Sequence, residues 1–279
     1  MDGDMGGDMG SELVRIPFDG RQIDIEYQWL RPGRARRPLV VFLHEGLGSI
    51  SMWRDFPRQF CEAGDFRGLV FSRYGYGRST PRPPDEKWGV DFMHRQAREA
   101  LPAFFETLGI GPGRPHGKPW LLGHSDGGSI ALIHAAGFPD AVDGMTVLAP
   151  HIVVVDVSVR SIATTRETYL HTDLRARLAR HHADVDSAFW GWNDIWLNPE
   201  FRHFDLRPLL ADIRCPVLAV QGEDDEYGTM AQIEGIQRYA PQTVLLKLAR
   251  CGHSPHRDQA GALTAATAAF ITANTSILK

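Results

Sequence analysis

Apolar and polar positions follow a regular order of strands and helices along most of the chain. Leu13 to Leu30 alternates apolar and polar residues around Asp19-Gly20, which predicts two antiparallel strands joined by a tight turn. The later strands are predicted from short runs of apolar residues, a pattern typical of strands buried on both faces. These runs lie at residues 39–43, 68–72, 119–122, 144–149, 215–220 and 243–248.

Helical spacing of apolar residues fills the intervals between these runs. Helices are expected at residues 52–61, 90–108, 227–239 and 259–271, and directly after Ser125. The alternation of strand and helix predicts an α/β protein with a mostly parallel, doubly covered sheet.

This alternation is interrupted between His151 and Pro208, where helical spacing continues without a buried strand. The interval is rich in aromatic residues: Tyr169, Phe189, Trp190, Trp192, Trp196, Phe201 and Phe204. We therefore expect an α/β core formed by residues 12–150 and 209–279, with residues 151–208 inserted as a helical cap, or lid. Residues 1–11 are acidic and glycine-rich, which is typical of a disordered tail.

Composition narrows the class of protein. The chain has 279 residues, of which 43% are hydrophobic and 23% charged, and its formal net charge is −4, which fits a globular enzyme and argues against nucleic acid or an anionic membrane as partner. No apolar run is long enough to span a membrane, and the N-terminus lacks the pattern of a signal peptide. Cys61, Cys215 and Cys251 are odd in number and far apart, so we expect a reduced, cytoplasmic protein, of open oligomeric state.

The segment Gly123-His124-Ser125-Asp126-Gly127 lies between an expected strand and an expected helix. Gly-x-Ser-x-Gly in this context is the pattern of a nucleophile elbow, a tight turn that presents its serine above the edge of the sheet. The turn strains the serine backbone and leaves little room for side chains at the flanking positions. The alternative is an ordinary glycine turn that contains a serine.

A serine hydroxyl is a poor nucleophile unless a base accepts its proton, and a histidine oriented by a carboxylate can do so. In an elbow enzyme these partners follow later in the chain, the acid before the histidine. An acidic loop, Gln221 to Glu226, follows the strand that ends at Val220, and His253 and His256 follow the strand that ends near Leu248. The expected chemistry requires neither a metal nor an organic cofactor.

With these motifs the chain resembles the α/β-hydrolase superfamily over residues 12–275. The glycine turn His44 to Ser49 resembles the family's oxyanion loop, and Arg73 to Ser79 resembles its Arg-Gly-x-Gly-x-Ser turn. Gly222-x-x-Asp225 matches its acid loop and Gly252-His253-x-Pro255 its histidine loop. The resemblance implies an α/β-hydrolase fold and the activity of a serine hydrolase.

Carried over position by position, the resemblance implies Ser125 as nucleophile, Asp225 as acid and His253 as base. The backbone N–H groups of Gly46 and Asp126 would form the oxyanion hole. Asp225 is favoured because it stands third after Gly222. The rivals for the acid are Asp224 and Glu226, with Asp156 as a weaker substitute, and a solvated acidic loop is the alternative for the whole segment.

Other residues near these motifs have open roles. Glu45 stands where the family usually has glycine, and we expect its carboxylate to pair with Arg54 or Arg73 rather than to contact substrate. Asp126 caps the following helix or contacts substrate. His44 and His124 are expected to organise their turns. His256 is expected to line the cleft or to face solvent.

The lid residues also allow two interpretations. Trp190, Trp192 and Trp196 form the lid's own core or line a pocket for an aromatic or alkyl acyl group. The basic residues of this interval are expected to be offset by acidic neighbours: Arg166, Arg175, Arg177, Arg180, His181 and His182 against Glu167, Asp173, Asp184 and Asp186.

The function expected from these features is hydrolysis of a small carboxylic ester, thioester, lactone or amide through an acyl-enzyme. One alternative is a C–C bond hydrolase of a ring-fission diketone, which uses the same triad. The other is a ligand receptor on the same scaffold with little or no turnover.

Overall fold

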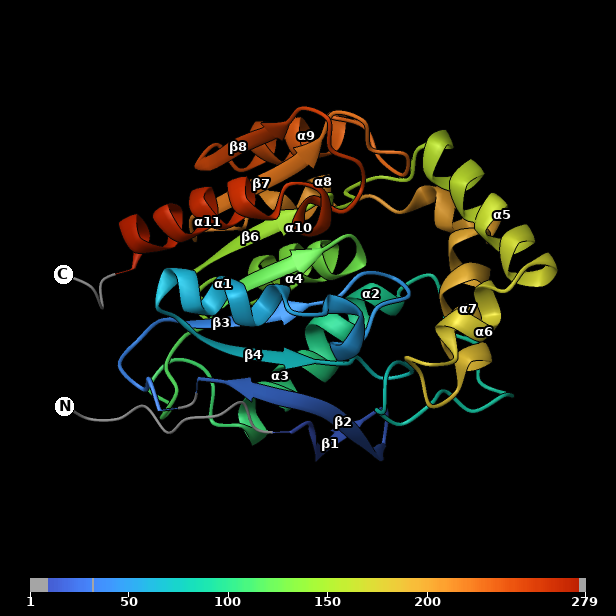
Figure 1. The fold of residues 1–279 in the computed structure, drawn as a ribbon, viewed down its shortest axis with the longest axis horizontal. Coiled ribbons are helices and arrows are strands. Elements are labelled where there is room, and N and C mark those ends of the chain that lie inside the picture. Colours follow the sequence, from blue (N-terminus) through green and yellow to red (C-terminus); the bar gives the residue numbers. More distant parts are fainter. Residues whose placement is uncertain (1–9, 32, 276–279) are drawn as a thin grey trace.

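The structure is a computed structural model that describes residues 10–31 and 33–275. One eight-stranded sheet runs through the molecule in the order β1-β2-β4-β3-β5-β6-β7-β8 (Figure 1). The strands are β1 (Glu12–Phe18), β2 (Arg21–Leu30), β3 (Leu39–Leu43), β4 (Arg67–Phe71), β5 (Trp120–His124), β6 (Gly144–Leu148), β7 (Val217–Gly222) and β8 (Thr243–Leu248).

Strand pairing agrees with the predicted fold class. Strands β1 and β2 form an antiparallel hairpin in which Phe18 pairs with Arg21, and β2 is antiparallel to β4. All remaining neighbours are parallel. The carboxyl ends of β3, β5, β7 and β8 therefore meet at one edge of the sheet, which is where open α/β sheets place their sites.

Helices and helical turns cover both faces and one end of this sheet. They are η1 (Ile50–Trp53), α1 (Phe56–Gly64), α2 (Phe92–Arg95), η2 (Gln96–Ala100), α3 (Leu101–Thr107), α4 (Asp126–Gly137), α5 (Asp156–His171), α6 (Leu174–Leu178), α7 (Val185–Trp196), η3 (Pro199–His203), α8 (Arg207–Leu210), α9 (Ala231–Tyr239), α10 (Pro255–Asp258) and α11 (Ala260–Asn274).

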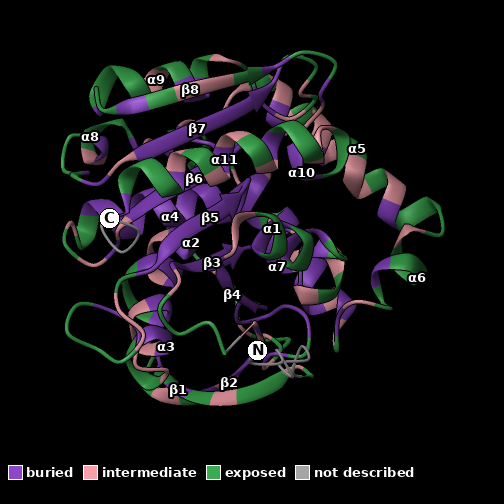
Figure 2. Ribbon diagram, turned by 60° about the vertical axis from the view of Figure 1, so that its left-hand side comes forward, coloured by how far each residue is buried: buried purple, intermediate pink, exposed green. Residues whose placement is uncertain are grey.

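Two apolar clusters fill the space between the sheet and its helices. One includes Phe42, Phe60 and Trp120 beneath α1 and α11, and the other includes Val41 and Leu121 on the opposite face. Figure 2 shows the central strands as a buried band with exposed helix surfaces outside it. All five residues of β5 are buried, so the segment after this strand starts from a rigid position.

The predicted helices 52–61 and 90–108 are present but interrupted. The first is divided into η1 and α1 around Asp55. The second contains five π-helical residues, η2, directly before Leu101 and Pro102. Because proline has no N–H to continue an α-helical ladder, the wider turn precedes the position where that ladder is broken.

The residues between β6 and β7 contain helices α5 to α8 and a single bridge between Val153 and Asp205. Helices α5, α6 and α7 lie to one side of the sheet, beyond the carboxyl ends of the strands (Figure 1). Helix α8 instead packs against α4 and α9. The expected lid boundary at residue 208 therefore falls inside a helix that contacts the core.

Candidate active site

Ser125 occupies the turn between β5 and α4, with φ 52° and ψ −118°. A positive φ is strained for a residue with a side chain. A Cβ atom added to Gly123 would lie 2.3 Å from the carbonyl oxygen of Gly127, and one added to Gly127 would lie 2.1 Å from the carbonyl oxygen of Leu43. Close backbone packing on both sides of Ser125 therefore requires the two glycines.

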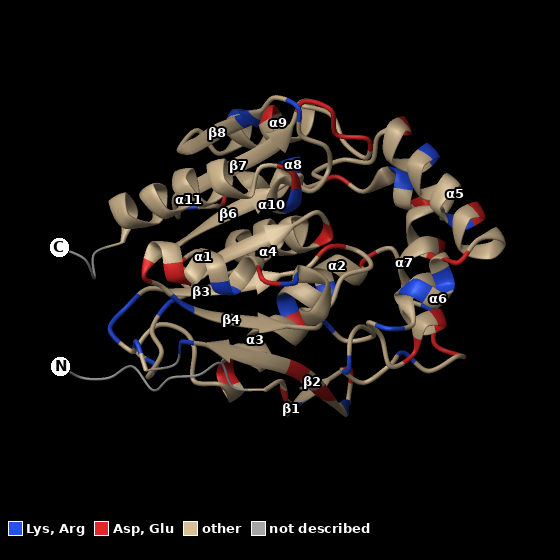
Figure 3. Ribbon diagram, in the orientation of Figure 1, with Lys and Arg blue, Asp and Glu red and all other residues tan. Residues whose placement is uncertain are grey.

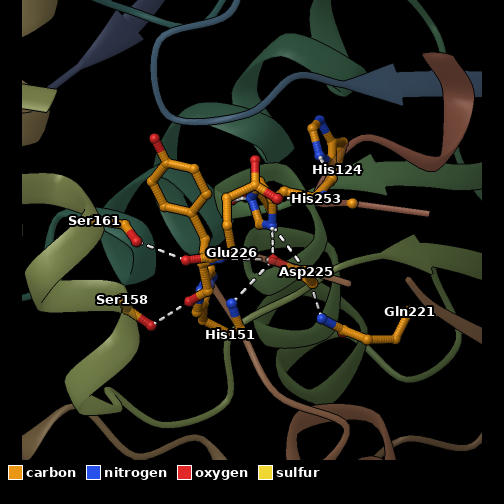
Figure 4. A network of polar contacts seen from close by, with 12 residues as sticks. His124, His151, Ser158, Ser161, Gln221, Asp225, Glu226 and His253 are labelled. Carbon is orange, nitrogen blue, oxygen red and sulfur yellow. Dashed lines mark hydrogen bonds and ion pairs between the residues drawn. The ribbon is translucent and has the colours of Figure 1, made fainter. Parts of the chain in front are cut away.

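Three side chains from separate loops meet at this turn. His253 Nε2 lies 3.0 Å from Ser125 Oγ, and His253 Nδ1 lies 2.9 and 3.0 Å from the two carboxylate oxygens of Asp225. Figure 4 shows the His253 ring above Asp225. With Nδ1–H donating to the carboxylate, Nε2 is left to accept the hydroxyl proton of Ser125.

The Asp225 carboxylate is held by further donors. It accepts hydrogen bonds from the backbone N–H groups of Tyr227 (2.8 Å) and Gly228 (3.0 Å), and from the side-chain amide of Gln221. Burial raises the pKa of Asp225, but the hydrogen bond and charge of His253 and the two N–H groups outweigh it and hold the pKa below its ordinary value. The carboxylate is therefore ionised at neutral pH.

The rival acids have other positions. The Glu226 carboxylate accepts a hydrogen bond from the backbone N–H of His253 at 3.0 Å and does not orient its ring. Asp224 is exposed. Asp156 forms an exposed ion pair with Arg202 at 2.5 Å. Of the acids considered, Asp225 is the one whose carboxylate contacts His253 Nδ1.

The two backbone groups considered for an oxyanion hole border the same cavity as Ser125. Gly46 follows β3, and Asp126 is the first residue of α4. The N-terminus of a helix carries a partial positive charge, which favours an anion beside Ser125. The indole of Trp192 covers Gly46 so closely that a Cβ atom there would lie 2.1 Å from Trp192 Nε1.

The Asp126 side chain is fully buried and does not cap α4. One carboxylate oxygen accepts a hydrogen bond from Trp196 Nε1 at 3.2 Å, and the other has no hydrogen-bond partner among the described residues. Burial raises the pKa of Asp126 to about 6, against the opposing effects of the Arg73 charge and the Trp196 N–H. Asp126 therefore presents a carboxyl group of elevated pKa beside Ser125.

The partners of Glu45 differ from the expected ones. Arg73 donates to the backbone carbonyl of Glu45 at 2.8 Å, not to its carboxylate. The carboxylate instead lies 3.6 Å from His124 Nδ1 and 4.0 Å from Arg257 Nη2. Glu45 also borders the cavity at Ser125.

The other histidines near the elbow have separate environments. His44 organises its turn, because its Nδ1–H donates to the Glu45 carbonyl at 2.7 Å and its Nε2 accepts from the Arg73 N–H at 3.0 Å. His256 is buried against Trp53 and Phe56, so it neither lines the cavity nor faces solvent. Burial and the nearby charge of His124 lower the pKa of His256 to about 2.

The cavity at Ser125 has a volume of about 160 Å³. Its walls come from the oxyanion loop, the elbow, the acid and histidine loops and the lid helices α5 and α7. The lining residues are Glu45, Gly46, Leu47, His124, Ser125, Asp126, His151, Ile162, Thr165, Trp192, Trp196, Tyr227, His253 and Ser254. Of these, His151 was not predicted from sequence, although it follows β6 at the same edge of the sheet.

The tryptophans of α7 divide between the two expected roles. Trp192 and Trp196 line the cavity. Trp190 lies within the lid, in edge contact with Tyr169 and Phe189, with Arg166 over its ring at 5.2 Å. One helix therefore supplies both the lid core and a cavity wall.

Most basic residues of the lid have acidic or aromatic neighbours. Arg175 pairs with Asp186 at 2.5 Å, and Arg177 pairs with Asp173 at 3.3 Å. Figure 3 shows blue and red segments close together on α5 and α6. These ion pairs agree with the expectation that acidic neighbours offset the positive charges on a solvated helix surface.

Helix α5 is bound to the acid loop by its hydroxyl groups. Ser161 Oγ donates to the backbone carbonyl of Glu226 at 2.6 Å, and Ser158 Oγ donates to that of Tyr227 at 2.5 Å (Figure 4). Thr165 Oγ1 also lies 3.0 Å from Tyr227 Oη. One side of the lid is therefore joined directly to the loop that carries Asp225.

The described residues form neither a cluster of metal-ligating side chains nor a membrane-spanning helix. Within residues 10–31 and 33–275, no group of three or more His, Cys, Asp or Glu side chains is arranged to hold a metal ion. Over the same described residues, every helix is too short or too polar to cross a lipid bilayer.

Known proteins resemble this chain in sequence over part of its length and in fold over most of it. Human serine hydrolase BPHL is 28% identical over 174 residues, which is 57% of this chain and 54% of that protein, so the chain spans about half of this relative. The enol-lactonase of Burkholderia xenovorans LB400 superposes over 93% of this chain and 100% of its own, with a TM-score of 0.71 and 18% identity. A meta-cleavage product hydrolase from Pseudomonas fluorescens IP01 superposes over 94% and 98%, with a TM-score of 0.68 and 16% identity.

A sequence model described as "Alpha/beta hydrolase family" matches residues 40–267. This match includes β3 to β8, the elbow, and the loops that carry Asp225 and His253. The chain therefore belongs to the alpha/beta hydrolase family.

Proposed function

We propose that this protein is a hydrolase that cleaves a small carboxylic ester through an acyl-enzyme formed on Ser125. The observation that carries the proposal is the chain of contacts from Asp225 through His253 to Ser125, at 2.9 and 3.0 Å, on a strained turn that borders a cavity. Thioesters, lactones and activated amides have the same reacting carbonyl and belong to the same class.

In the first half of the reaction, Ser125 Oγ attacks the substrate carbonyl carbon while His253 Nε2 accepts its proton. Asp225 stabilises the imidazolium that forms, and the N–H groups of Gly46 and Asp126 donate to the oxyanion. The tetrahedral intermediate collapses when its C–O bond to the leaving group breaks. His253 returns the proton to the departing alcohol, and an acyl-Ser125 ester remains.

In the second half, water takes the place of the alcohol. His253 Nε2 accepts a proton from the water as its oxygen attacks the acyl carbonyl, and the same N–H groups bind the second oxyanion. Collapse breaks the bond to Ser125 Oγ, which regains the proton from His253. The products are one alcohol and one carboxylic acid for each ester and water consumed.

The lid completes the site in this proposal. Residues 151–208 act as a cap that closes the cavity over Ser125, with α8 attached to the core. Trp192 and Trp196 then limit the size of the acyl or alcohol group, because both border the cavity.

A substrate panel tests the proposal against its alternative. Purified protein is assayed with 4-nitrophenyl esters of graded chain length, acyl-CoA thioesters and a ring-fission diketone, with Ser125→Ala as the control. Turnover of esters with a burst of 4-nitrophenol supports the acyl-enzyme. Turnover of the diketone alone would make the protein a C–C bond hydrolase, and binding without turnover would favour a receptor.

A further inference from the structure

The departure of Glu45 from the family's glycine has a structural counterpart. Its carboxylate is directed at His124, with Oε2 3.6 Å from Nδ1, and its side chain is 18% exposed. Gly48 leaves the space for this arrangement, since a Cβ atom there would lie 2.5 Å from Glu45 Oε2. The backbone of Glu45 is fixed separately by Arg73, so the direction of its side chain is set by the loop.

His124 connects this carboxylate to the histidine loop. Its ring is 2% exposed, and Nε2 lies 2.7 Å from the backbone carbonyl oxygen of His253. Because a carbonyl can only accept, Nε2 carries a proton and donates it. Nδ1 is buried without a hydrogen-bond partner among the described residues and faces the Glu45 carboxylate at 3.6 Å.

The ionised form of Glu45 is stabilised by its surroundings. Burial alone raises the pKa of Glu45, but the interaction with His124 outweighs burial and brings the pKa well below its ordinary range. Arg257, a residue of α10, adds a positive group 4.0 Å from the carboxylate. Glu45 is therefore an ionised carboxylate between the elbow and the histidine loop.

The backbone of His253 is consequently held on both sides. Glu226 accepts from its N–H at 3.0 Å, and His124 donates to its carbonyl at 2.7 Å. These two contacts fix the peptide groups from which the His253 ring extends toward Ser125 and Asp225. Small displacements of a catalytic group reduce rates strongly, about 100-fold for 1 Å.

We propose that Glu45 and His124 form a positioning pair that holds His253 and the oxyanion loop in register across the elbow. Neither side chain reacts with substrate in this proposal, which rests on the proposed function of Ser125 and His253. The pair joins three loops: Glu45 lies beside Gly46, His124 precedes Ser125, and the His124 N–H reaches His253.

Two substitutions of one residue separate this role from general support of the fold. His124→Gln places an amide N–H near the position of Nε2 and keeps a donor for the His253 carbonyl, whereas His124→Asn is too short to do so. We expect His124→Asn to lower kcat on a 4-nitrophenyl ester by about 10- to 100-fold with KM changed less than about threefold. His124→Gln should retain kcat within about fivefold.

Glu45→Gln provides the second measurement, with the exposed Glu62→Gln as its matched control. Loss of the charge should lower kcat and the rate constant of labelling by a fluorophosphonate together, by about 3- to 30-fold, while the fraction of sites labelled at completion stays near one. Glu62→Gln should match the wild type in both.

The outcomes distinguish three cases. A wild-type kcat and labelling rate in His124→Asn would overturn the positioning role. Equal losses in His124→Asn and His124→Gln, with a lower Tm and fewer competent sites, would also overturn it, because the pair would then support only the fold. If Ser125→Ala is labelled and active like the wild type, the proposed function itself fails.

Discussion

The elbow and residues 151–208, the expected lid, both border one cavity, but different forces hold them in place. At the elbow, backbone atoms approach so closely that Gly123 and Gly127 admit no Cβ, and Ser125 adopts a positive φ. In the lid, packing is made by interchangeable apolar and aromatic side chains, such as the stacked rings of Tyr169 and Phe189 with centroids 3.6 Å apart. A short sequence motif is therefore enough to predict the elbow, whereas the lid is predicted only from its content of apolar and aromatic residues.

This difference predicts where substitutions act. Changes at the elbow and its partners should alter the rate of chemistry with little effect on stability. Changes in the lid should alter substrate preference where a side chain borders the cavity and stability where it does not. The four measurements below test this division, in order of decreasing expected effect.

The largest effect is expected for Ser125→Ala, which removes the hydroxyl of the proposed nucleophile and keeps the Cβ atom at the strained turn. Ester hydrolysis should fall by about 10⁴-fold or more, and fluorophosphonate labelling should disappear, with an unchanged or higher Tm. Thr272→Ala, which removes an exposed hydroxyl of α11 far along the chain from the cavity residues, is the control for loss of a hydroxyl. Labelling that persists in Ser125→Ala would place the nucleophile elsewhere.

The next effect is expected for Asp225→Asn. The amide can favour the wrong tautomer of His253, so kcat should fall by roughly 10²- to 10⁴-fold while KM changes little. Asp224→Asn, on the same loop but exposed, should remain within about threefold of the wild type. A reversed result for the two variants would contradict the assignment of the acid.

Two of the three tryptophans of α7 sharpen the comparison within the lid itself. Trp192→Ala should enlarge the cavity and shift the preferred acyl chain to greater length. Across esters of graded chain length, the activation free energy that corresponds to kcat/KM should change by roughly 1–3 kcal/mol. Trp190→Ala should lower Tm through lost packing and leave the chain-length profile unchanged. Profiles measured on 4-nitrophenyl esters, together with thermal melts, check both. An unchanged profile in Trp192→Ala would remove the lid wall from substrate selection.

The smallest effect concerns the pH dependence of stability at Asp126. Its pKa is raised to about 6 by burial, above the ordinary value of 3.8, so the folded state is relatively favoured when the group is protonated. This contribution is fully present below pH 3.8 and is lost as the pH rises through about 6. Asp126→Asn should therefore gain stability relative to the wild type between pH 4 and pH 7, by on the order of 2 kcal/mol.

Denaturant unfolding at several pH values measures this difference. The exposed Asp140→Asn should follow the wild type throughout. A constant difference between Asp126→Asn and the wild type over this range would mean that Asp126 does not titrate differently in the folded state.

The features that sequence predicted are those that depend on local backbone demands. The strand and turn around Ser125, the order of the acid and histidine loops and the hairpin at Asp19-Gly20 each follow from a short segment. The alternation of strands and helices was also sufficient to predict the parallel sheet, and the match to the alpha/beta hydrolase family confirms that fold.

The features that sequence did not predict depend on contacts between distant segments. Glu45 lies against His124 and Arg257 instead of Arg54 or Arg73 because several strand ends meet at one edge. His151 carries no motif, although its ring lies 5.8 Å from that of His253. Spacing within α7 likewise did not separate Trp190 from Trp192, since both occupy apolar positions of one helix.

The attachment of α5 to the acid loop has a consequence for protein engineering. Exchange of the helices after β6 would alter the cavity wall, but Ser158, Ser161 and Thr165 also contact Glu226 and Tyr227, which lie next to Asp225, the proposed catalytic acid. A graft that replaced α5 would remove those contacts and disturb Asp225 together with the substrate wall. An exchange that begins after Thr165 and keeps the first turns of α5 would transfer the cavity-facing α7 without disturbing the acid loop.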